Sequence, residues 1–239
     1  MIYAVISDIH ANLEALEVCL NEIDKIKPDR LICLGDLVDY CAQPNEVIEI
    51  IKNRCDVIIL GNHDEAQFDY SLADGFSANA YISSLHTRKV IKQEYIEYFE
   101  TLLYSHLEND LFFVHASPYM PEKYKYVLDI ETAKINFESF DEKVCFIGHS
   151  HVPVIFEQSG NRINIIEPSK LDSSCRYIIN VGSVGQPRDG NPKLSFGLFD
   201  TDKFEYRLIR LGYDIKSASD KILKEGLPEF LAMRLLAGI

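Results

Sequence analysis

With 239 residues, of which 47% are hydrophobic and 26% charged, the chain has the size and composition of one globular domain with a full hydrophobic core. Its formal net charge of −13 repels nucleic acid and anionic lipid, so we expect neither a nucleic-acid duplex nor a membrane as a partner. No apolar run approaches the ~18 residues that a bilayer span requires.

The N-terminal part of the chain alternates between short apolar runs, typical of buried strands, and segments with helical spacing. Strands are expected at residues 2–6, 31–34 and 57–60. Between them, Asn12 can cap a helix that Pro28 ends, and residues 44–53 predict a second helix. This order of strand and helix indicates βαβ units and a largely parallel sheet.

The middle of the chain is less regular. Residues 68–75 predict a loop, and the polar stretch 78–104, which is rich in Tyr and Leu, predicts one or two helices. Strands are expected at 111–114 and 144–147, with a helix at 132–140 between them.

The last third predicts a mostly antiparallel run of strands, which could form a second sheet packed against the first. Residues 152–157 and 162–166 flank Gln158-Ser159-Gly160-Asn161, a hairpin signal. Further strands are expected at 177–180, 194–199 and 204–211, and a helical pattern covers 215–235. Because the sequence has no internal repeat and no linker, we predict a single domain over residues 1–239, with 213–239 as a C-terminal helical tail.

The cysteines and the N-terminus both bear on the cellular compartment. The six cysteines form no Cys-x-x-Cys pair, and several lie inside apolar runs, as Cys33 and Cys145 do. Free buried thiols are therefore expected rather than disulfides. The N-terminus has no basic segment and reaches Asp8 almost at once, which indicates a first strand rather than a signal peptide. These features predict a cytoplasmic protein.

Residues that suit metal binding or catalysis follow the ends of five predicted strands. In chain order the motifs are Asp8-Ile9-His10, Gly35-Asp36, Gly61-Asn62-His63-Asp64, His115 and Gly148-His149-Ser150-His151. Ligand sites in open α/β sheets lie at the carboxyl ends of strands, so the motifs are expected to converge on one crevice. Each motif alone has an ordinary explanation, such as a turn or a packed histidine. Their combination and order make the set specific.

The residue types and their spacing suit metal ions. Asp8 and His10 are two residues apart, so both can reach one ion from a strand end, and His149 and His151 repeat that spacing. Mixed Asp and His ligands fit manganese, iron, zinc, cobalt or nickel. The glycines that precede several ligands allow a tight turn and a close approach of the backbone.

In this order the motifs resemble those of the calcineurin-like metallophosphoesterase superfamily: Asp-x-His, Gly-Asp, Gly-Asn-His-Asp/Glu, a lone His and Gly-His-x-His. The stretch Asn180-Val181-Gly182-Ser183-Val184-Gly185-Gln186-Pro187-Arg188 also resembles a small bacterial and archaeal phosphodiesterase-like branch. The resemblance implies an α/β fold, a four-layer α/β/β/α sandwich of two mixed β-sheets flanked by helices, with the metals at the strand ends. Only the C-terminal helical tail is unmatched.

The resemblance also implies a role for each motif residue. Asp8, His10 and His151 would bind one divalent metal ion, Asn62, His115 and His149 would bind a second, and Asp36 would bridge the two. His63 would contact the substrate phosphate and be oriented by Asp64. A metal-bridging hydroxide would attack phosphorus, while Asn62 and His63 neutralise the developing charge. Of these metals, we expect manganese to support activity best.

Two positions depart from the protein Ser/Thr phosphatase branch. That branch carries an arginine after its Gly-Asp-x-x-Asp block and another after Gly-Asn-His-Glu, whereas this chain has Tyr40 and Glu65 there. A phosphate clamp from those two positions is missing. Arg188 or Arg176 could supply a substitute, and each could equally be an ordinary surface arginine; of the two, Arg188 is the residue we expect to bind substrate.

The predicted function is hydrolysis of a small phosphorylated substrate, as a phosphodiesterase or a phosphatase, with a dinucleoside polyphosphate as one candidate. One alternative is a protein Ser/Thr phosphatase, which the missing arginines argue against. The other is a non-catalytic metal-binding scaffold, as a retromer subunit with this fold is believed to be. A scaffold has no need of His63, so its presence favours an enzyme. The motifs do not specify the exact substrate, the native metal pair or the oligomeric state.

Several residues lie outside every motif. His86 and His106 are both assigned to the expected helical stretch and are predicted to be packing residues. The tyrosines of that stretch are expected to pack in the core or, alternatively, to line a pocket and stack on a nucleobase; they are Tyr81, Tyr95, Tyr98 and Tyr104. Substrate choice is expected to depend on the loops at 68–76 and 117–126.

Overall fold

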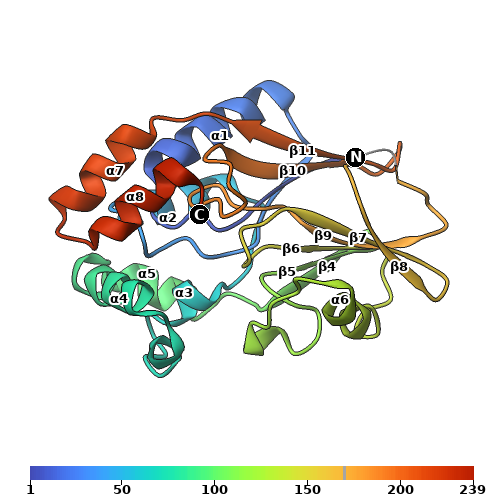
Figure 1. Cartoon of the computed structure of the whole chain (residues 1–239), viewed down its shortest axis with the longest axis horizontal. Helices are drawn as coiled ribbons and strands as arrows, with labels where there is room; N and C mark the ends of the chain where they lie inside the picture. Colours follow the sequence, from blue (N-terminus) through green and yellow to red (C-terminus); the bar gives the residue numbers. More distant parts are fainter. Residues whose placement is uncertain (169–170) are drawn as a thin grey trace.

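Two β-sheets pack face to face in the computed structural model, and helices cover the outer face of each sheet (Figure 1). The structure describes residues 1–168 and 171–239. Large side chains fill the space between the sheets, among them Tyr3, Val5, Phe113, Phe146 and Ile179, all of which are fully buried. This architecture confirms the predicted four-layer α/β fold with two mixed sheets flanked by helices.

The first sheet has the strand order β11-β10-β1-β2-β3. Its strands are β1 (Ile2–Ile6), β2 (Arg30–Cys33), β3 (Val57–Ile58), β10 (Leu194–Asp200) and β11 (Glu205–Leu211). β1, β2 and β3 are parallel, whereas β10 is antiparallel to β1 and β11 to β10. The apolar faces of α1 (Leu13–Ile26) and α2 (Pro44–Arg54) cover this sheet. Asn12 caps α1 as expected, because its side chain accepts a hydrogen bond from the backbone N–H of Ala15.

The second sheet has the strand order β4-β5-β6-β9-β7-β8. Its strands are β4 (Ser105–Glu108), β5 (Leu111–Val114), β6 (Val144–Ile147), β7 (Val154–Ser159), β8 (Arg162–Ile166) and β9 (Arg176–Asn180). β5, β6 and β9 are parallel, and β7 and β8 form the predicted hairpin. Helix α6 (Ile130–Phe137) covers the outer face, where Ala133 and Phe137 pack against Phe112 and Phe156.

The expected grouping of the last strands into one antiparallel sheet is wrong in two respects. β10 and β11 join the first sheet, and β9 is parallel to β6. All but the last residue of β10 is buried, which suits a strand in the interior of a sheet. The pattern of apolar residues identifies a strand but does not identify the strands beside it.

The expected helical stretch consists of α4 (Ala78–Val90) and α5 (Gln93–Phe99), so it ends earlier than the sequence predicts. The placement of His106 in that stretch is wrong, because His106 lies in β4, opposite Phe113 of β5. His86 lies in α4, as expected. Short helical turns also occur at α3 (Asn62–Glu65), η1 (Leu72–Gly75) and η2 (Pro121–Lys123).

The C-terminal segment forms α7 (Ile215–Lys224) and α8 (Glu229–Ala237). Ile222, Leu231 and Leu235 belong to an apolar cluster that also contains Ala11 and Tyr40, which lie in the loops after β1 and β2. The helical tail is therefore packed on loops at the carboxyl ends of the central strands. No helix of the described ranges has the length and apolar character of a membrane span. All six cysteines are free thiols, as expected.

Candidate metal centre

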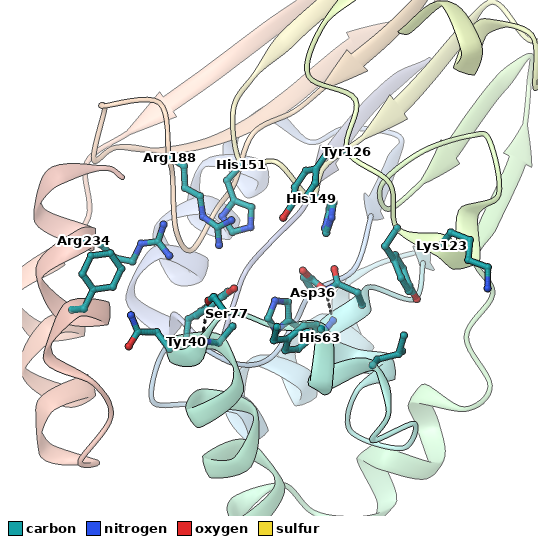
Figure 2. Close-up of a pocket in the computed structure, with 18 residues that line it drawn as sticks. Asp36, Tyr40, His63, Ser77, Lys123, Tyr126, His149, His151, Arg188 and Arg234 are labelled. Atoms are coloured by element: carbon teal, nitrogen blue, oxygen red, sulfur yellow. Dashed lines mark hydrogen bonds between the residues drawn. The ribbon is translucent and has the colours of Figure 1, made fainter. Parts of the chain in front are cut away.

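The seven residues expected to bind metals come together at one end of both sheets. Asp8 and His10 follow β1, Asp36 follows β2 and Asn62 begins α3; His115 follows β5, and His149 and His151 follow β6. All seven are buried, with exposed fractions between 0% and 8%. Figure 2 shows Asp36, His149 and His151 facing one cavity from different elements.

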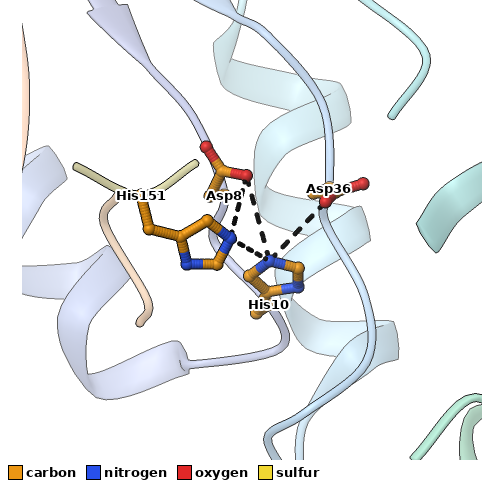
Figure 3. A group of neighbouring side chains, drawn as sticks. All are labelled: Asp8, His10, Asp36 and His151. Carbon is orange, nitrogen blue, oxygen red and sulfur yellow. Dashed lines mark hydrogen bonds and ion pairs between the residues drawn. The ribbon is translucent and has the colours of Figure 1, made fainter. Parts of the chain in front are cut away.

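Four of these residues form a first cluster: Asp8, His10, Asp36 and His151 (Figure 3). One possible ligand atom from each lies within 4.8 Å of the others. His151 Nε2 is 3.2 Å from Asp8 Oδ1, and His10 Nε2 is 3.6 Å from Asp36 Oδ2. The Nε2 atoms of His10 and His151 are 3.1 Å apart.

A second cluster contains Asp36, His115 and His149, again with ligand atoms within 4.8 Å of one another. His115 Nε2 is 3.3 Å from Asp36 Oδ2 and 3.2 Å from Asn62 Oδ1. The expected seven-residue set is thus assembled, and Asp36 belongs to both clusters, in the position that a bridging ligand requires.

The histidine rings are held so that the Nε2 atoms point into the clusters. The Nδ1 atoms of His10, His115 and His151 lie 2.6–2.9 Å from backbone carbonyl oxygens, those of Val38, Leu34 and Gln186. A carbonyl at Nδ1 requires the proton there, which leaves Nε2 of a neutral imidazole as an acceptor.

With neutral imidazoles, the Nε2 atoms and the carboxylate oxygens in the clusters are acceptors that face one another. The buried Asp36 Oδ2 has no hydrogen-bond partner within the described residues. Buried lone pairs that face one another are unfavourable unless a proton or a metal cation lies between them. The donor set and its arrangement fit two divalent ions that share Asp36.

The ionisation of these groups also suits metal binding. Burial opposes a charge on Asp8, but His151 and His115 hold the pKa of Asp8 below its ordinary range. Burial, followed by the effect of His115, lowers the pKa of His149 to about 3. Burial lowers the pKa of His115 as well, yet Asp36 outweighs it and raises that pKa to about 9. A metal ion at His115 would displace this proton, as metals do on binding.

The backbone at the site is strained. Asp8, His10, Asp36, His149 and His151 all have φ between 50° and 64°, a left-handed conformation that residues other than glycine rarely adopt. Such strain is concentrated at functional sites, where the surrounding structure maintains it. At two neighbouring glycines a side chain would not fit: a Cβ at Gly61 would lie 2.2 Å from Asp36 Oδ1, and one at Gly148 would lie 2.5 Å from Asp8 Oδ2.

His63 lies beside the first cluster without belonging to it. Its Nδ1 is 2.7 Å from Asp39 Oδ2, and Gln67 Nε2 donates a hydrogen bond to the other oxygen of Asp39 at 3.2 Å. Burial opposes a charge on His63, but Asp36 and Asp39 raise the pKa of His63 above its ordinary value. The imidazole is therefore fixed in orientation and favoured in its charged form.

The expectation that Asp64 orients His63 is wrong. The Asp64 carboxylate accepts hydrogen bonds from the backbone N–H groups of Leu37, at 2.8 Å, and Gly61, at 3.3 Å. Asn62 begins the short helix α3, so adjacent side chains point in different directions, and Asp64 turns back to the N-terminus of the helix. Asp39 was missed, although its place three residues after Asp36, in a Gly-Asp-x-x-Asp block, is a signal in the sequence.

A cavity of about 640 Å³ opens beside the two clusters (Figure 2). The loops at 68–76 and 117–126, on which substrate choice is expected to depend, contribute to its wall, through Phe76, Tyr124 and Tyr126 among others. The Tyr126 ring stacks on His149, with 4.2 Å between the ring centroids. None of the tyrosines singled out in the stretch 78–104 is among its described lining residues.

The two arginines considered as phosphate ligands have different positions. Arg188 lines the cavity, and its guanidinium lies 5.5 Å from the centre of the Tyr40 ring. Arg176 lies elsewhere and donates hydrogen bonds to the backbone carbonyls of Phe137, Phe140 and Glu142. Arg176 is thus a structural residue that ties the end of α6 to β9.

The two positions that depart from protein phosphatases are both occupied by buried side chains. Tyr40 is buried and lines the cavity. Glu65 is buried and accepts hydrogen bonds from the hydroxyls of Tyr104, at 2.7 Å, and Tyr124, at 2.5 Å. Glu65 therefore fixes a tyrosine of the cavity wall and offers no positive charge to a phosphate.

Comparison with known proteins agrees with this site. A family model for the calcineurin-like phosphoesterase superfamily domain matches residues 1–203. The chain is 40% identical over 240 residues to an uncharacterized protein of Methanocaldococcus jannaschii. The alignment covers 98% of this chain and 97% of the relative. The crystal structure of a metallophosphoesterase from Sphaerobacter thermophilus is 35% identical and has a TM-score of 0.87, covering 100% of this chain and 99% of that one.

A hypothetical protein from Pyrococcus horikoshii has the same fold at 21% identity, with a TM-score of 0.82 over 100% of this chain and 98% of that one. The family match covers all five motifs that supply the two clusters. The chain therefore belongs to the calcineurin-like phosphoesterase superfamily.

Proposed function

We propose that the protein is a metal-dependent phosphoesterase that hydrolyses small phosphorylated molecules. The observation that carries this proposal is the position of His63. Its side chain lies beside Asp36 and lines the cavity, and Asp39 fixes the orientation of its ring. His63 nevertheless belongs to neither of the two clusters of possible metal ligands. A protein that only binds metals has no use for such a residue, whereas phosphate-ester hydrolysis needs a positive charge or a proton at this place.

In this proposal Asp8, His10 and His151 hold one divalent ion, Asn62, His115 and His149 hold the other, and Asp36 is shared. Bound ions would supply polarisation of the phosphoryl group and an activated water. Manganese is the ion proposed to support activity, because oxygen and imidazole ligands without thiolates suit it.

The reaction adds water to phosphorus and breaks the bond from phosphorus to the ester oxygen. The leaving oxygen must receive a proton or have its charge neutralised. His63 can do either, because Asp36 and Asp39 favour its charged form against the effect of burial. Asn62 Oδ1 faces His115, so the amide NH₂ group of Asn62 can donate to a phosphoryl oxygen.

The cavity supports a small substrate in preference to a protein. Its volume of about 640 Å³ lies within the range of sites for small molecules. Phosphomonoesters and phosphodiesters both belong to the proposed substrate class, and a dinucleoside polyphosphate is the more specific candidate. The rings of Phe76, Tyr126 and Phe230 in the cavity wall support a substrate with an aromatic group.

The experiment is a panel of p-nitrophenyl monoesters and diesters, assayed with the chelated protein and after addition of manganese. We expect hydrolysis only with the metal, and a loss of at least a hundredfold in kcat for His63→Ala. His63→Ala should still bind manganese, as measured by calorimetry, because His63 belongs to neither cluster. His86→Ala, on α4, is the control and should keep full activity. Undiminished hydrolysis by the chelated protein would overturn the proposal, as would full activity of His63→Ala.

A further inference from the structure

Two arginines from distant parts of the chain point into the same side of the cavity (Figure 2). Arg188 belongs to the loop between β9 and β10, and Arg234 belongs to α8. Arg234 lies outside residues 1–203, the part of the chain that the family model matches. This side of the cavity is therefore built partly by the C-terminal helical pair.

Neither guanidinium is paired with a carboxylate side chain among the described residues. Nε and Nη2 of Arg188 donate hydrogen bonds to Gln186 Oε1 at 3.2 and 2.7 Å. Nε of Arg234 donates to the backbone oxygen of Ile239 at 2.5 Å, and its guanidinium lies 5.4 Å from the centre of the Phe230 ring. Within the described residues, Nε is the only guanidinium atom of Arg234 that donates a hydrogen bond, so its Nη groups are available to a ligand.

The charges of the two arginines act on each other. Burial, followed by the positive charge of Arg188, lowers the pKa of Arg234 to about 10, so Arg234 is still charged at neutral pH. Among the described residues that line the cavity, Asp36 is the only one with a carboxylate. That carboxylate belongs to both clusters, so an anion that enters the cavity would relieve the repulsion between the two guanidiniums.

Such an anion would be distinct from a phosphate bound at the metal centre. Arg188 adjoins the first cluster, because its backbone N–H donates to the carbonyl oxygen of His151 at 3.3 Å. Arg234 lies on the other side of Arg188, on α8, beside Phe230. A phosphoryl group at the metals leaves the Nη groups of Arg234 available to a second group on the same substrate.

We propose that Arg188 and Arg234 form a second anion site, and that the substrate carries a second phosphate group besides the one that is hydrolysed. This inference rests on the proposed function of the metal centre. A guanidinium binds phosphate through parallel hydrogen bonds, and two guanidiniums match the charge of a terminal phosphate. The second phosphate is unchanged in the reaction, in which water replaces the ester oxygen only at the phosphorus beside the metals.

The test compares two substrates that differ only in the second phosphate: thymidine 5′-(p-nitrophenyl phosphate) and the same compound phosphorylated at the 3′ oxygen. With manganese, we expect the wild-type protein to prefer the second compound by about tenfold in kcat/KM, a difference of about 1.4 kcal/mol. Arg234→Gln should abolish this preference by raising KM for the second compound. Arg234→Lys should retain part of it, because lysine keeps the charge but loses the paired hydrogen bonds.

Arg207→Gln, at an exposed arginine of β11, is the matched control and should keep the preference. The second-anion site is overturned if the wild-type protein hydrolyses both compounds equally well, or if Arg234→Gln retains the preference. Calorimetry with thymidine 3′,5′-bisphosphate and thymidine 5′-monophosphate tests the site without catalysis. Tighter binding of the bisphosphate that is lost in Arg234→Gln, with no hydrolysis of either ester, would contradict the proposed function and leave the anion site in place.

Discussion

Asp39 and Asp64 both lie close to His63 in the chain and differ in what they contact. Asp39 meets the His63 imidazole at 2.7 Å, whereas Asp64 accepts hydrogen bonds from two backbone N–H groups, those of Leu37 and Gly61. The first carboxylate therefore orients a side chain that lines the cavity. The second joins the loop after β2 to the loop after β3.

Asp39→Asn should reduce kcat by about tenfold to a hundredfold, the usual cost of removing a carboxylate that orients a functional histidine. The amide keeps the shape of the side chain but removes the negative charge beside His63. The manganese content of the variant, measured by elemental analysis, should equal that of the wild type. Asp24→Asn, on α1, is the control and should keep full activity. An unchanged kcat in Asp39→Asn would remove Asp39 from the site.

Asp64→Ala should act on stability. It leaves the backbone N–H groups of Leu37 and Gly61 without their acceptor, which costs about 2–4 kcal/mol for two buried donors. Urea unfolding of the chelated protein measures this loss in the free energy of unfolding. A variant that unfolds at the same urea concentration as the wild type, yet is inactive, would instead assign Asp64 to the chemistry.

The six residues of the two clusters and the adjacent Asn62 were predictable because the motifs fix which side chains follow which strands. The choice of Asp39 over Asp64 as the partner of His63 was not, since it depends on the direction of side chains in a four-residue helical turn. The left-handed conformations of Asp8, His10, Asp36, His149 and His151 were also hidden, because no local sequence preference favours them. Contacts between distant segments maintain them.

At the scale of the elements, an ion pair connects the two sheets. Arg30 of β2 lies 2.8 Å from Glu108 of β4, and the Tyr3 hydroxyl of β1 donates to the same carboxylate at 3.0 Å. Burial opposes the charge on Glu108, but Arg30, His106 and Tyr3 hold the pKa of Glu108 below its ordinary value. Folding therefore favours the ionised carboxylate.

Glu108→Gln should lower the free energy of unfolding by about 1 kcal/mol at neutral pH, since the pair is only partly buried. Because the pKa of Glu108 is lower in the folded than in the unfolded protein, its contribution is present above the unfolded value and is lost as pH falls through the folded value. The wild type and the variant should thus converge in acid. Urea unfolding at neutral and acidic pH measures both differences, with Glu17→Gln, exposed on α1, as the control. A difference that persists in acid would indicate a packing effect.

The order of the helices and strands explains why the fold was only partly predictable. The strands and helices of the first half follow from local patterns, and β1, α1, β2 and α2 lie where those patterns indicate, within a few residues at their ends. The positions of β10 and β11 depend on which strand edge remains open after the parallel strands have formed. That edge, along β1, is set by the whole sheet and not by the residues of β10.

At the scale of the whole molecule, each of the two clusters of possible metal ligands combines residues from both sheets. The first cluster combines residues that follow β1 and β2 of one sheet with His151, which follows β6 of the other. The second cluster combines Asp36 with His115 and His149, again from both sheets. Bound metal ions would therefore connect the two halves of the sandwich, and their binding free energy would add to the stability of the fold.

Manganese should accordingly raise the Tm of the protein. At a metal concentration of one hundred times Kd, a single site adds about 2.7 kcal/mol, which corresponds to a rise of several degrees for a protein of this size. Differential scanning calorimetry with manganese and with a chelator measures the rise. His115→Ala removes a ligand from one cluster and should lose part of the rise, whereas His86→Ala should keep all of it. If manganese binds at two equivalents per chain and leaves Tm unchanged, the unfolded chain binds the ions equally well, and the assignment of the ions to two clusters that only folding assembles is wrong.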